Sequence, residues 1–335
     1  MEDGKIRWGI VSTADIGLKK VIPGIQRSKT GIAFAIGSRD KARADAAARA
    51  LGIERAYGSY EDLLADPDVD AVYIPLPNHL HVPLTRQAVE AGKHVLCEKP
   101  LALNAEEAAQ LRDLPKDRLV AENFMVRAHP QWMMAREIIR SGELGELKAI
   151  QAFFSYFNDD PGNIRNMADI GGGALYDIGC YTMLAGRYFF EAEPQRVVSL
   201  IDKDPQFGTD RMSSALLDFG AGRHLTFTVS TQLTPYQRVQ LVGTKKRLEI
   251  VIPVNAPQGE AVSLRVDDGS VLGDAVMQTQ IISPCDQYAE LVDVFGKAVA
   301  GEAPLPYGLE DAIQNMKVLD ALFASAVDGG WVSLS

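Results

Sequence analysis

The sequence predicts an α/β protein of two domains, and three observations support this fold class. The chain has 335 residues, 47% of them hydrophobic, so it can bury a large core, and its length favours two domains. From residue 6 to about 122, short apolar strands alternate with amphipathic helices, which is typical of a parallel sheet covered on both faces. Farther along, several segments alternate with period two, which predicts a large, mostly antiparallel open sheet.

The first domain is expected to span residues 1–123. Its strands are expected, in chain order, at 6–11, 32–38, 70–77, 94–100 and 118–123. Helices are expected to follow the first four strands, through residue 25, over 41–52, over 81–91 and after Asn104. Asn104 can cap the last of these helices, with Glu107 at the third helical position.

The second domain is expected to span residues 124–335 and to begin with a helix near 130–141. Its predicted strands, which resemble neighbouring antiparallel strands, include LKAIQAFFSYF, SSALLDF, HLTFTVSTQL, RVQLVG and RLEIVIP. Leu225, Phe227 and Val229 share one apolar face of this sheet. Either a second subunit or helices of the same chain are expected to cover that face.

Composition and charge exclude several classes of partner. The net charge of −10 and the pI near 5.1 argue against binding to nucleic acid or to anionic membranes, and favour a small-molecule partner. The three cysteines lie far apart without a C-x-x-C pair, which fits a reducing compartment. The chain shows neither a signal-peptide pattern nor an apolar run of the roughly 20 residues that span a membrane, so a cytoplasmic location is expected.

The stretch GIVSTADIG, residues 9–17, follows the first strand and opens a helix. Aligned with the dinucleotide-binding pattern G-x-G-x-x-G, it has Ser12, Ala14 and Gly17 at the three glycine positions. Backbone N–H groups and a helix N-terminus can still face an anion in such a turn, and the hydroxyls of Ser12 and Thr13 can donate hydrogen bonds to phosphate. The strand, turn and helix context therefore predicts a pyrophosphate site rather than a turn without a ligand.

The second predicted strand ends in GSRDKAR, where a Gly-Ser pair stands in place of the acid that binds the ribose of NAD. Three basic residues follow and suit a 2′-phosphate: Arg39, Lys41 and Arg43. The sequence therefore predicts NADP(H). Asp40 keeps NAD as the alternative, and the basic residues could also be a solvated helix start.

Two further stretches have the residue types of a catalytic site. HVLCEKP places Glu98 and Lys99 at the end of a strand, before a proline that could form a cis peptide bond. GGGALYDIGCYTM, residues 171–183, places Asp177 and Tyr181 four positions apart, on one face if a helix has begun. An open parallel sheet binds ligands beyond the carboxyl ends of its strands, which is where these residues are expected.

Five motifs in this order resemble the Gfo/Idh/MocA family, named for glucose-fructose oxidoreductase, inositol dehydrogenase and a rhizopine-catabolism protein. They are GIVSTADIG, PNHLH, AGKHVLCEKPLA, GELGEL and GGGALYDIG, and the resemblance covers essentially the whole chain. It implies an N-terminal Rossmann domain that binds NAD or NADP, and a C-terminal α/β domain that binds substrate on a large open sheet. It also implies homodimers or homotetramers formed through that sheet.

The resemblance assigns the family's catalytic lysine to Lys99 and its acid to Asp177, and it places Tyr181 where histidine is often found. This tyrosine resembles the branch of glucose-fructose oxidoreductase, dihydrodiol dehydrogenase and sugar dehydrogenases. We expect hydride transfer between nicotinamide C4 and a sugar carbinol carbon, with aldopyranose C1 and a lactone product as the leading case. Tyr181 would exchange the hydroxyl proton, and the ammonium of Lys99 would lower its pKa from about 10 by about 2 to 3 units. Asp177 would hold substrate hydroxyls and orient Lys99, whereas the alternative for Tyr181 is a packed aromatic ring.

The turn, the basic residues and the resemblance together give a set of expected cofactor contacts. These are Ser12, Thr13, Ala14, Ile16, Ser38, Arg39, Lys41, Leu76, Asn78, His81, Glu98, Lys99 and Arg165. Arg127 and His129 are expected to line the same cleft. His79 and His81 lack a clear third and fourth ligand, so no metal site is expected.

Other enzyme classes fit less well. None of the ten tyrosines has a lysine four positions later, which excludes short-chain dehydrogenases, and no Cys/His zinc site of an alcohol dehydrogenase is visible. Two alternatives stay open: an NAD-dependent glycoside hydrolase of the same family, and a non-enzymatic NADP-binding sensor. The joint presence of Lys99, Asp177 and Tyr181 argues against the sensor.

Overall fold

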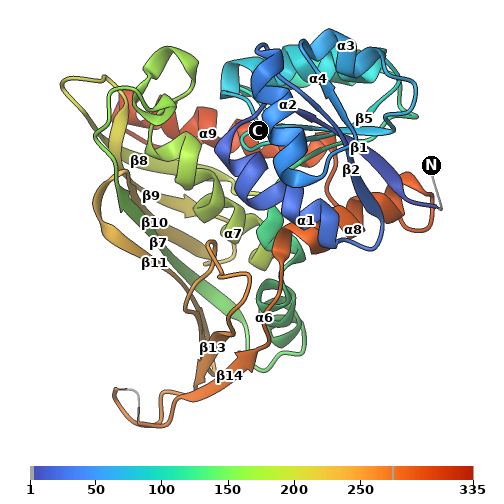
Figure 1. Ribbon diagram of the computed structural model, residues 1–335. Coiled ribbons are helices and arrows are strands. Elements are labelled where there is room, and N and C mark those ends of the chain that lie inside the picture. The colour runs from blue at the N-terminus through green and yellow to red at the C-terminus, as the bar shows by residue number, and fades with distance from the viewer. Residues whose placement is uncertain (1–3, 274, 335) are drawn as a thin grey trace. The chain divides into compact units, whose positions relative to one another are not determined.

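The computed structural model describes residues 4–273 and 275–334, which form two compact units (Figure 1). The first unit contains the chain up to Ala128 together with Asp286–Ile313. The second contains His129–Cys285 and the chain from Gln314 onward. The segment Asp286–Ile313 therefore joins the first unit, although the sequence pattern places it in the second domain.

The first unit is built on a parallel sheet with the strand order β3-β2-β1-β4-β5-β6. The strands are β1 Ile6–Val11, β2 Gly31–Gly37, β3 Arg55–Tyr57, β4 Ala71–Ile74, β5 His94–Cys97 and β6 Val120–Glu122. All neighbouring pairs are parallel, which confirms the predicted parallel sheet. The strand order reverses between β1 and β4, and ligands of such sheets bind beyond the carboxyl ends at this point.

Helices of the first unit follow its strands along the chain, except the last, which comes from the segment Asp286–Ile313. They are α1 Ile22–Arg27, which continues a π-helical turn at Gly17–Val21, then α2 Lys41–Leu51, α3 Tyr60–Ala65, α4 His81–Glu90, α5 Ala105–Ala109 and α8 Gln287–Val299. The Asn104 side chain accepts a hydrogen bond from the Glu107 N–H, which confirms the predicted cap of α5. Helix α8 packs on α1, and a Cβ on Gly24 would lie only 2.7 Å from the Cβ of Tyr288. This close approach is why the segment after residue 285 belongs to the first unit.

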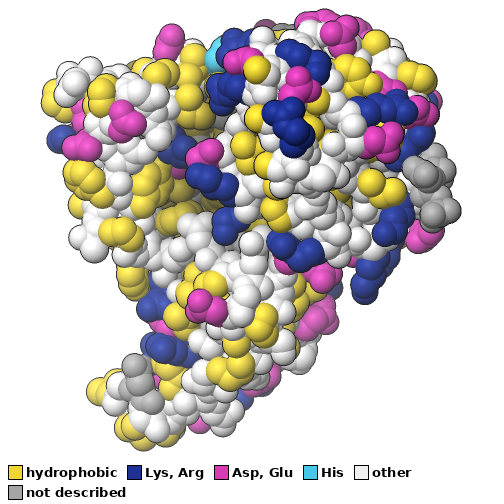
Figure 2. Space-filling view, in the orientation of Figure 1, with side chains coloured by type: hydrophobic (Ala, Val, Ile, Leu, Met, Phe, Trp, Pro, Cys, Tyr) yellow, Lys and Arg dark blue, Asp and Glu magenta, His cyan; other side chains and the backbone are white. Residues whose placement is uncertain are grey.

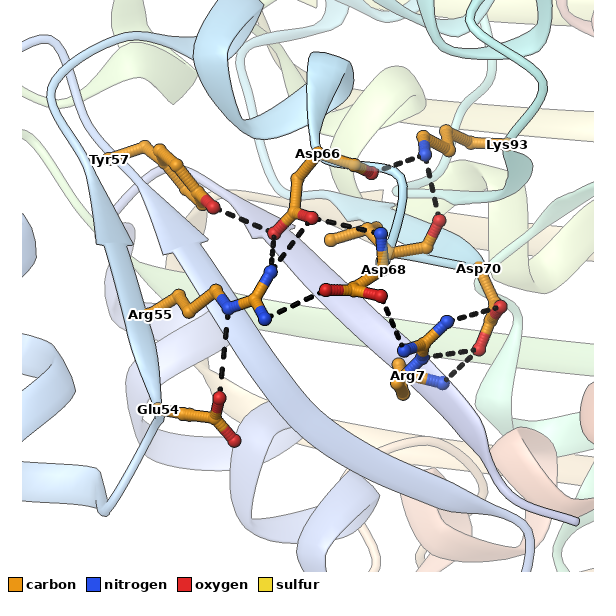
Figure 3. A network of polar contacts seen from close by, with 9 residues as sticks. Arg7, Glu54, Arg55, Tyr57, Asp66, Asp68, Asp70 and Lys93 are labelled. Atoms are coloured by element: carbon orange, nitrogen blue, oxygen red, sulfur yellow. Dashed lines mark hydrogen bonds and ion pairs between the residues drawn. The ribbon is translucent and has the colours of Figure 1, made fainter. Parts of the chain in front are cut away.

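A polar network stabilises the amino ends of the strands in the first unit (Figure 3). The backbone N–H of Arg7, on β1, donates to the Asp70 carboxylate just before β4 at 2.9 Å. Arg55 and Tyr57, on β3, donate to Asp66 at 2.9 and 2.7 Å. The buried Lys93 Nζ donates to two backbone carbonyls, Asp66 O at 2.6 Å and Val69 O at 2.8 Å. The network lies at the opposite end of β1 from the turn at residues 12–14, which the sequence predicts to bind phosphate, so it serves the fold rather than that site.

The second unit is built on a mixed sheet with the strand order β14-β13-β12-β11-β7-β10-β9-β8-β15. Its strands are β7 Leu147–Phe157, β8 Arg196–Lys203, β9 Asp210–Asp218, β10 His224–Ser230, β11 Gln232–Gly243, β12 Arg247–Ile250, β13 Val262–Asp267, β14 Gln278–Ile282 and β15 Val332–Ser333. The pairs are antiparallel except β7 with β10, which is parallel. The prediction of a mostly antiparallel sheet is confirmed, with this one pair as an exception.

One face of this sheet is covered by helices of the same chain. The helices are α6 Pro130–Arg140, α7 Cys180–Phe190 after a π-helical turn at Leu175–Gly179, and α9 Leu309–Asp328. Helix α7 packs on β7 and β10, where a Cβ on Gly186 would lie 2.9 Å from Leu225 Cδ2. Leu225, Phe227 and Val229 are at most 3% exposed. The expected alternative of a subunit contact on this face is therefore wrong, because α7 already occupies it.

The opposite face of the second sheet carries exposed side chains. Leu200 is 76% exposed, Met212 38% and Tyr236 48%. On the face of the molecule shown in Figure 2, acidic and basic side chains are intermixed over the first unit. No helix within residues 4–273 and 275–334 combines the length and the apolar character needed to cross a bilayer.

Candidate active site

The phosphate turn after β1 has the backbone geometry that glycine usually provides. Ser12 has a φ of +104°, in a region that side-chain-bearing residues rarely adopt. Its N–H donates to Gly37 O at 2.9 Å, and its hydroxyl donates to Pro75 O at 3.3 Å. The Ala14 N–H donates to the same hydroxyl oxygen at 3.2 Å. Ser12 therefore shapes the turn with both of its hydrogen-bond donors, and the expected donation from its hydroxyl to phosphate stays a prediction.

The rest of the turn offers donors at the start of a helix. The helix begins at Asp15, Thr13 and Ala14 are partly exposed, and Ile16 is 36% exposed. Gly17 faces Pro75, where a Cβ would make only ordinary contact at 3.5 Å. The first N–H groups of a helix lack intrahelical acceptors, so this exposed start is suited to a phosphate group.

The end of β2 carries charges with different partners. The carboxylate of Asp40 accepts hydrogen bonds from the N–H groups of Ala42 at 2.9 Å and Arg43 at 3.3 Å, and so caps α2. The Asp40 N–H donates to the hydroxyl of the buried Ser38 at 3.2 Å. Lys41 forms an ion pair with Asp45 one turn along α2. The one acid in GSRDKAR is thus engaged by the helix, and Lys41 already has a counter-charge.

Arg39 and Arg43 are the other two basic residues at the end of β2, and both affect the pKa of Tyr60. Burial raises the pKa of Tyr60, while the positive charges of Arg39 and Arg43 oppose this rise. Of the three basic residues expected near a 2′-phosphate, Arg39 and Arg43 therefore both place positive charge near Tyr60.

Glu98 and Lys99 follow β5, as the sequence predicts, and the Lys99–Pro100 peptide bond is cis. Glu98 Oε1 accepts hydrogen bonds from the hydroxyl of Tyr73 at 2.6 Å and from the side-chain amide of Asn123. Burial raises the pKa of Tyr73 well above its usual value, and the neighbouring charge of Glu98 raises it further. One donor on β4 and one directly after β6 therefore hold the carboxylate next to Lys99.

His81 connects the loops that follow β4 and β5. It is fully buried, with Nε2 at 2.7 Å from Leu76 O and Nδ1 at 2.8 Å from Pro100 O. Burial lowers its pKa, and the two carbonyl groups oppose this shift. Both ring nitrogens are occupied by the backbone, so His81 can act on a cofactor through the positions of these loops. Asn78 begins the short 3₁₀ turn that leads into His81.

In the second unit, Asp177 lies between two hydrogen-bond donors. Its Oδ2 accepts from Arg165 Nε at 2.8 Å and from the Tyr156 hydroxyl. Burial and the charge of Asp177 raise the pKa of Tyr156, and Arg165 opposes the rise. Arg165, expected as a cofactor or substrate contact, is thus an ion-pair partner of Asp177, while its contact with a cofactor stays a prediction.

Tyr181 stands in the first turn of α7 and is 6% exposed. Its ring centre lies 6.4 Å from that of Phe154 on β7. Asp177 belongs to the preceding π-helical turn, and four residues make close to one turn in either helix type. The two side chains therefore leave the helix on the same side, as the sequence spacing predicts.

Arg127 and His129 are engaged within the fold. Arg127 forms an ion pair with Asp311 and stacks on the Tyr307 ring at 4.0 Å. His129 Nδ1 accepts a hydrogen bond from the Gln131 N–H and caps α6, and burial lowers its pKa to about 4. Their expected place in a substrate cleft stays a prediction.

Sequence reasoning missed Tyr73, Asn123 and Tyr156, which hold the two candidate carboxylates. The sequence pattern could have indicated Tyr156, because it carries a hydroxyl on the same face of β7 as the apolar residues Ile150, Ala152 and Phe154. Tyr73 and Asn123 had none, because their contacts depend on strand pairing. Within residues 4–273 and 275–334, no group of three or more His, Cys, Asp or Glu side chains is arranged to hold a metal ion.

Two family models match the chain in succession. Residues 6–122 match an oxidoreductase family with an NAD-binding Rossmann fold. Residues 132–249 match the GFO/IDH/MocA C-terminal domain.

The chain is also similar to known proteins over almost its whole length. It is 48% identical to an uncharacterized oxidoreductase of Rhizobium meliloti, over 97% of this chain and 98% of the relative. It is 41% identical to D-xylose 1-dehydrogenase (NADP(+)) 2 of Haloferax volcanii, over 98% of this chain and 99% of the relative. A 3-ketoreductase from Actinomadura kijaniata, solved in complex with NADP and TDP-benzene, matches with a TM-score of 0.87 and 30% identity, over 96% of this chain and 98% of that one. The chain therefore belongs to the Gfo/Idh/MocA family of oxidoreductases, whose N-terminal domain is an NAD-binding Rossmann fold.

Proposed function

We propose that this protein is an NADP-dependent sugar dehydrogenase that oxidises a carbinol carbon, with C1 of an aldopyranose as the leading substrate position. The observation that carries the proposal is the end of β2, where Arg39 and Arg43 are exposed while Asp40 caps α2. A carboxylate engaged in this way is poorly placed to bind the ribose hydroxyl of NAD, and two guanidinium groups suit a 2′-phosphate. The 41% identity to an NADP-dependent xylose dehydrogenase supports the same cofactor and substrate class.

The first unit fits a dinucleotide on three counts. The positive φ of Ser12 shapes the turn, the helix start at Asp15 would present its N–H groups to the pyrophosphate, and Arg39 would contact the 2′-phosphate. Ile16, Leu76, Asn78 and Lys99 would complete the contacts. When bound, NADP⁺ accepts the hydride.

Tyr181 is proposed to exchange the proton of the sugar hydroxyl. Its packing on Phe154 holds the ring in one orientation, which an acid–base group needs. A fall of about 2 to 3 units from the ordinary tyrosine pKa corresponds to roughly 3 to 4 kcal/mol, and the ammonium of Lys99 is proposed to supply it. Asp177, held by Tyr156 and Arg165, would bind substrate hydroxyls.

The test is a panel of aldoses that includes D-xylose and D-glucose, with NADP⁺ and NAD⁺ compared by absorbance at 340 nm. Reduction of NADP⁺ by at least one aldose, with weaker activity on NAD⁺, is expected. Release of sugar from p-nitrophenyl glycosides without net cofactor reduction would instead identify a hydrolase. Binding of NADP⁺ without turnover of any sugar or glycoside would identify a sensor.

We further propose a homodimer or homotetramer formed through the uncovered face of the second sheet. The exposed side chains of Leu200 and Met212 lie on the neighbouring strands β8 and β9, that of Tyr236 lies on β11 of the same sheet, and all three support this proposal. Multi-angle light scattering measures the mass of the particle. Leu200→Glu is expected to reduce it, and a wild-type particle of one chain contradicts the proposal.

A further inference from the structure

A buried carboxylate lies at the start of the helical segment that carries Asp177 and Tyr181. Asp210 is the first residue of β9 and is 4% exposed. Its Oδ2 accepts hydrogen bonds from the Leu175 N–H at 2.7 Å and from the Ser213 hydroxyl at 2.9 Å. Leu175 opens the π-helical turn, and the first N–H groups of a helix have no intrahelical acceptor. A residue of β9, 35 positions farther along the chain, therefore caps the start of this helix.

Gly173 makes this contact sterically specific. Its φ is +116°, and a Cβ at this position would lie 1.9 Å from Asp210 Oδ1. The Gly173 N–H donates to Arg165 O at 2.8 Å, and its carbonyl accepts from the Asp177 N–H at 3.1 Å. The last glycine of GGG thus packs on Asp210 and links the backbones of Arg165 and Asp177.

The same two residues are also joined through their side chains. Arg165 Nε donates to Asp177 Oδ2 at 2.8 Å, and the Tyr156 hydroxyl donates to the same oxygen. The backbone link through Gly173 and the side-chain ion pair close a ring around the helix start. A shift of Leu175 would therefore move Asp177 and its partner Arg165. It would also move Tyr181, because the helix is continuous from residue 174.

We propose that Asp210 is a positioning residue for the reaction, which sets the place of the helix start and thereby the orientation of Asp177 and Tyr181. The proposal rests on the proposed function of these two residues. Asp210 acts through the helix, since its side chain is buried and bonded to Leu175 and Ser213. A carboxylate is suited to this role because charge-assisted hydrogen bonds are short and strong and because a helix N-terminus favours a negative charge.

Two substitutions remove the contact, and two others in the β8–β9 connection serve as matched controls. Asp210→Ala removes the acceptor, and Gly173→Ala forces a Cβ against it. Asp204→Ala removes another carboxylate, which accepts from the N–H groups of Gln206 and Phe207 and from the side-chain amide of Gln232. Gly208→Ala substitutes a glycine whose φ is also positive, at +71°, with nothing within 4 Å of its Cβ position.

Amide hydrogen exchange of the unliganded protein tests the structural part without any substrate. In Asp210→Ala and Gly173→Ala, exchange in a peptide spanning residues 171–181 is expected to accelerate about 10-fold or more, because the helix start loses its cap. In Asp204→Ala and Gly208→Ala, the same peptide is expected to keep its wild-type rate. Wild-type protection in Asp210→Ala overturns the proposal.

Turnover of NADP⁺ with the aldose that the wild-type enzyme oxidises fastest tests the catalytic part. For Asp210→Ala, kcat is expected to fall by about 20-fold or more with the KM for NADP⁺ unchanged, because small displacements of reacting groups are costly. Asp210→Asn is expected to recover most of kcat, since its amide oxygen can still accept from the Leu175 N–H. A wild-type kcat in Asp210→Ala, or an equal loss in Asp204→Ala, overturns the proposal. If the wild-type enzyme oxidises no aldose, the proposed function fails, and the exchange experiment still decides whether Asp210 sets the helix start.

Discussion

The stability of the protein is expected to depend on pH through Asp210, and Asp210→Asn isolates this dependence. Burial raises the pKa of Asp210 from 3.8 to about 6, against the hydrogen bonds from Leu175 and Ser213 and the positive charge of Lys203. The folded state thus binds the Asp210 proton more tightly than the unfolded state does. A group of this kind contributes stability that is fully present below pH 3.8 and is lost as the pH rises through 6.

The size of the effect follows from the shift. A rise of roughly 2 pKa units corresponds to about 3 kcal/mol of unfolding free energy, lost by the wild type between about pH 4 and pH 7. Asparagine does not titrate, so the free energy of unfolding of Asp210→Asn relative to wild type should increase by about this amount over the same range.

Urea unfolding followed by circular dichroism between pH 4.5 and 7.5 measures this difference. Asp204→Asn is the control that should differ from wild type by a constant amount over this range, because hydrogen bonding by Gln232 lowers the pKa of Asp204 from 3.8 and its contribution is lost only at lower pH. A difference between Asp210→Asn and wild type that is constant over this pH range would refute the assignment of a raised pKa to Asp210.

Three further predictions concern the site and the fold. Lys99→Met and Tyr181→Phe are each expected to lower kcat by about 100-fold or more while NADP⁺ binding, measured by calorimetry, is retained; wild-type turnover in both would contradict the proposed acid–base pair. Arg39→Ala is expected to raise the KM for NADP⁺ by about 10-fold or more without changing that for NAD⁺, and an equal change for both cofactors would exclude a 2′-phosphate contact. Gly186→Val is expected to lower the free energy of unfolding by about 3 kcal/mol in urea titrations, because α7 packs directly on Leu225, and an unchanged midpoint would show that the helix can shift.

Local features of the fold could be predicted from the sequence because their causes lie within a few residues. The bounds of β1 follow from one apolar run, and the cap of α5 depends on Asn104 and Glu107, three residues apart. The parallel pairing of β7 with β10 and the packing of α8 on α1 could not be predicted. These contacts join segments far apart in the chain, and periodicity reports which face of a segment is buried without identifying what covers it.

The candidate site divides in the same way. Glu98, Lys99, Asp177 and Tyr181 were identified because motifs name residue types at fixed spacing. Their joint action in one reaction stays a prediction. The sequence also indicated that Ser12 could replace a glycine, and the structure adds a hydrogen bond from its hydroxyl to Pro75 O that the sequence could not predict.

By itself, the sequence determined the fold class, the two kinds of sheet and the family, because alternation, caps and motif spacing are local properties. The tertiary structure decided which side chains hold the candidate groups: His81 between two carbonyls, Arg165 on Asp177, and Asp210 at the helix start. The physical reason is that a buried polar group must find a partner, and the partner is chosen by packing of elements that are distant in the chain.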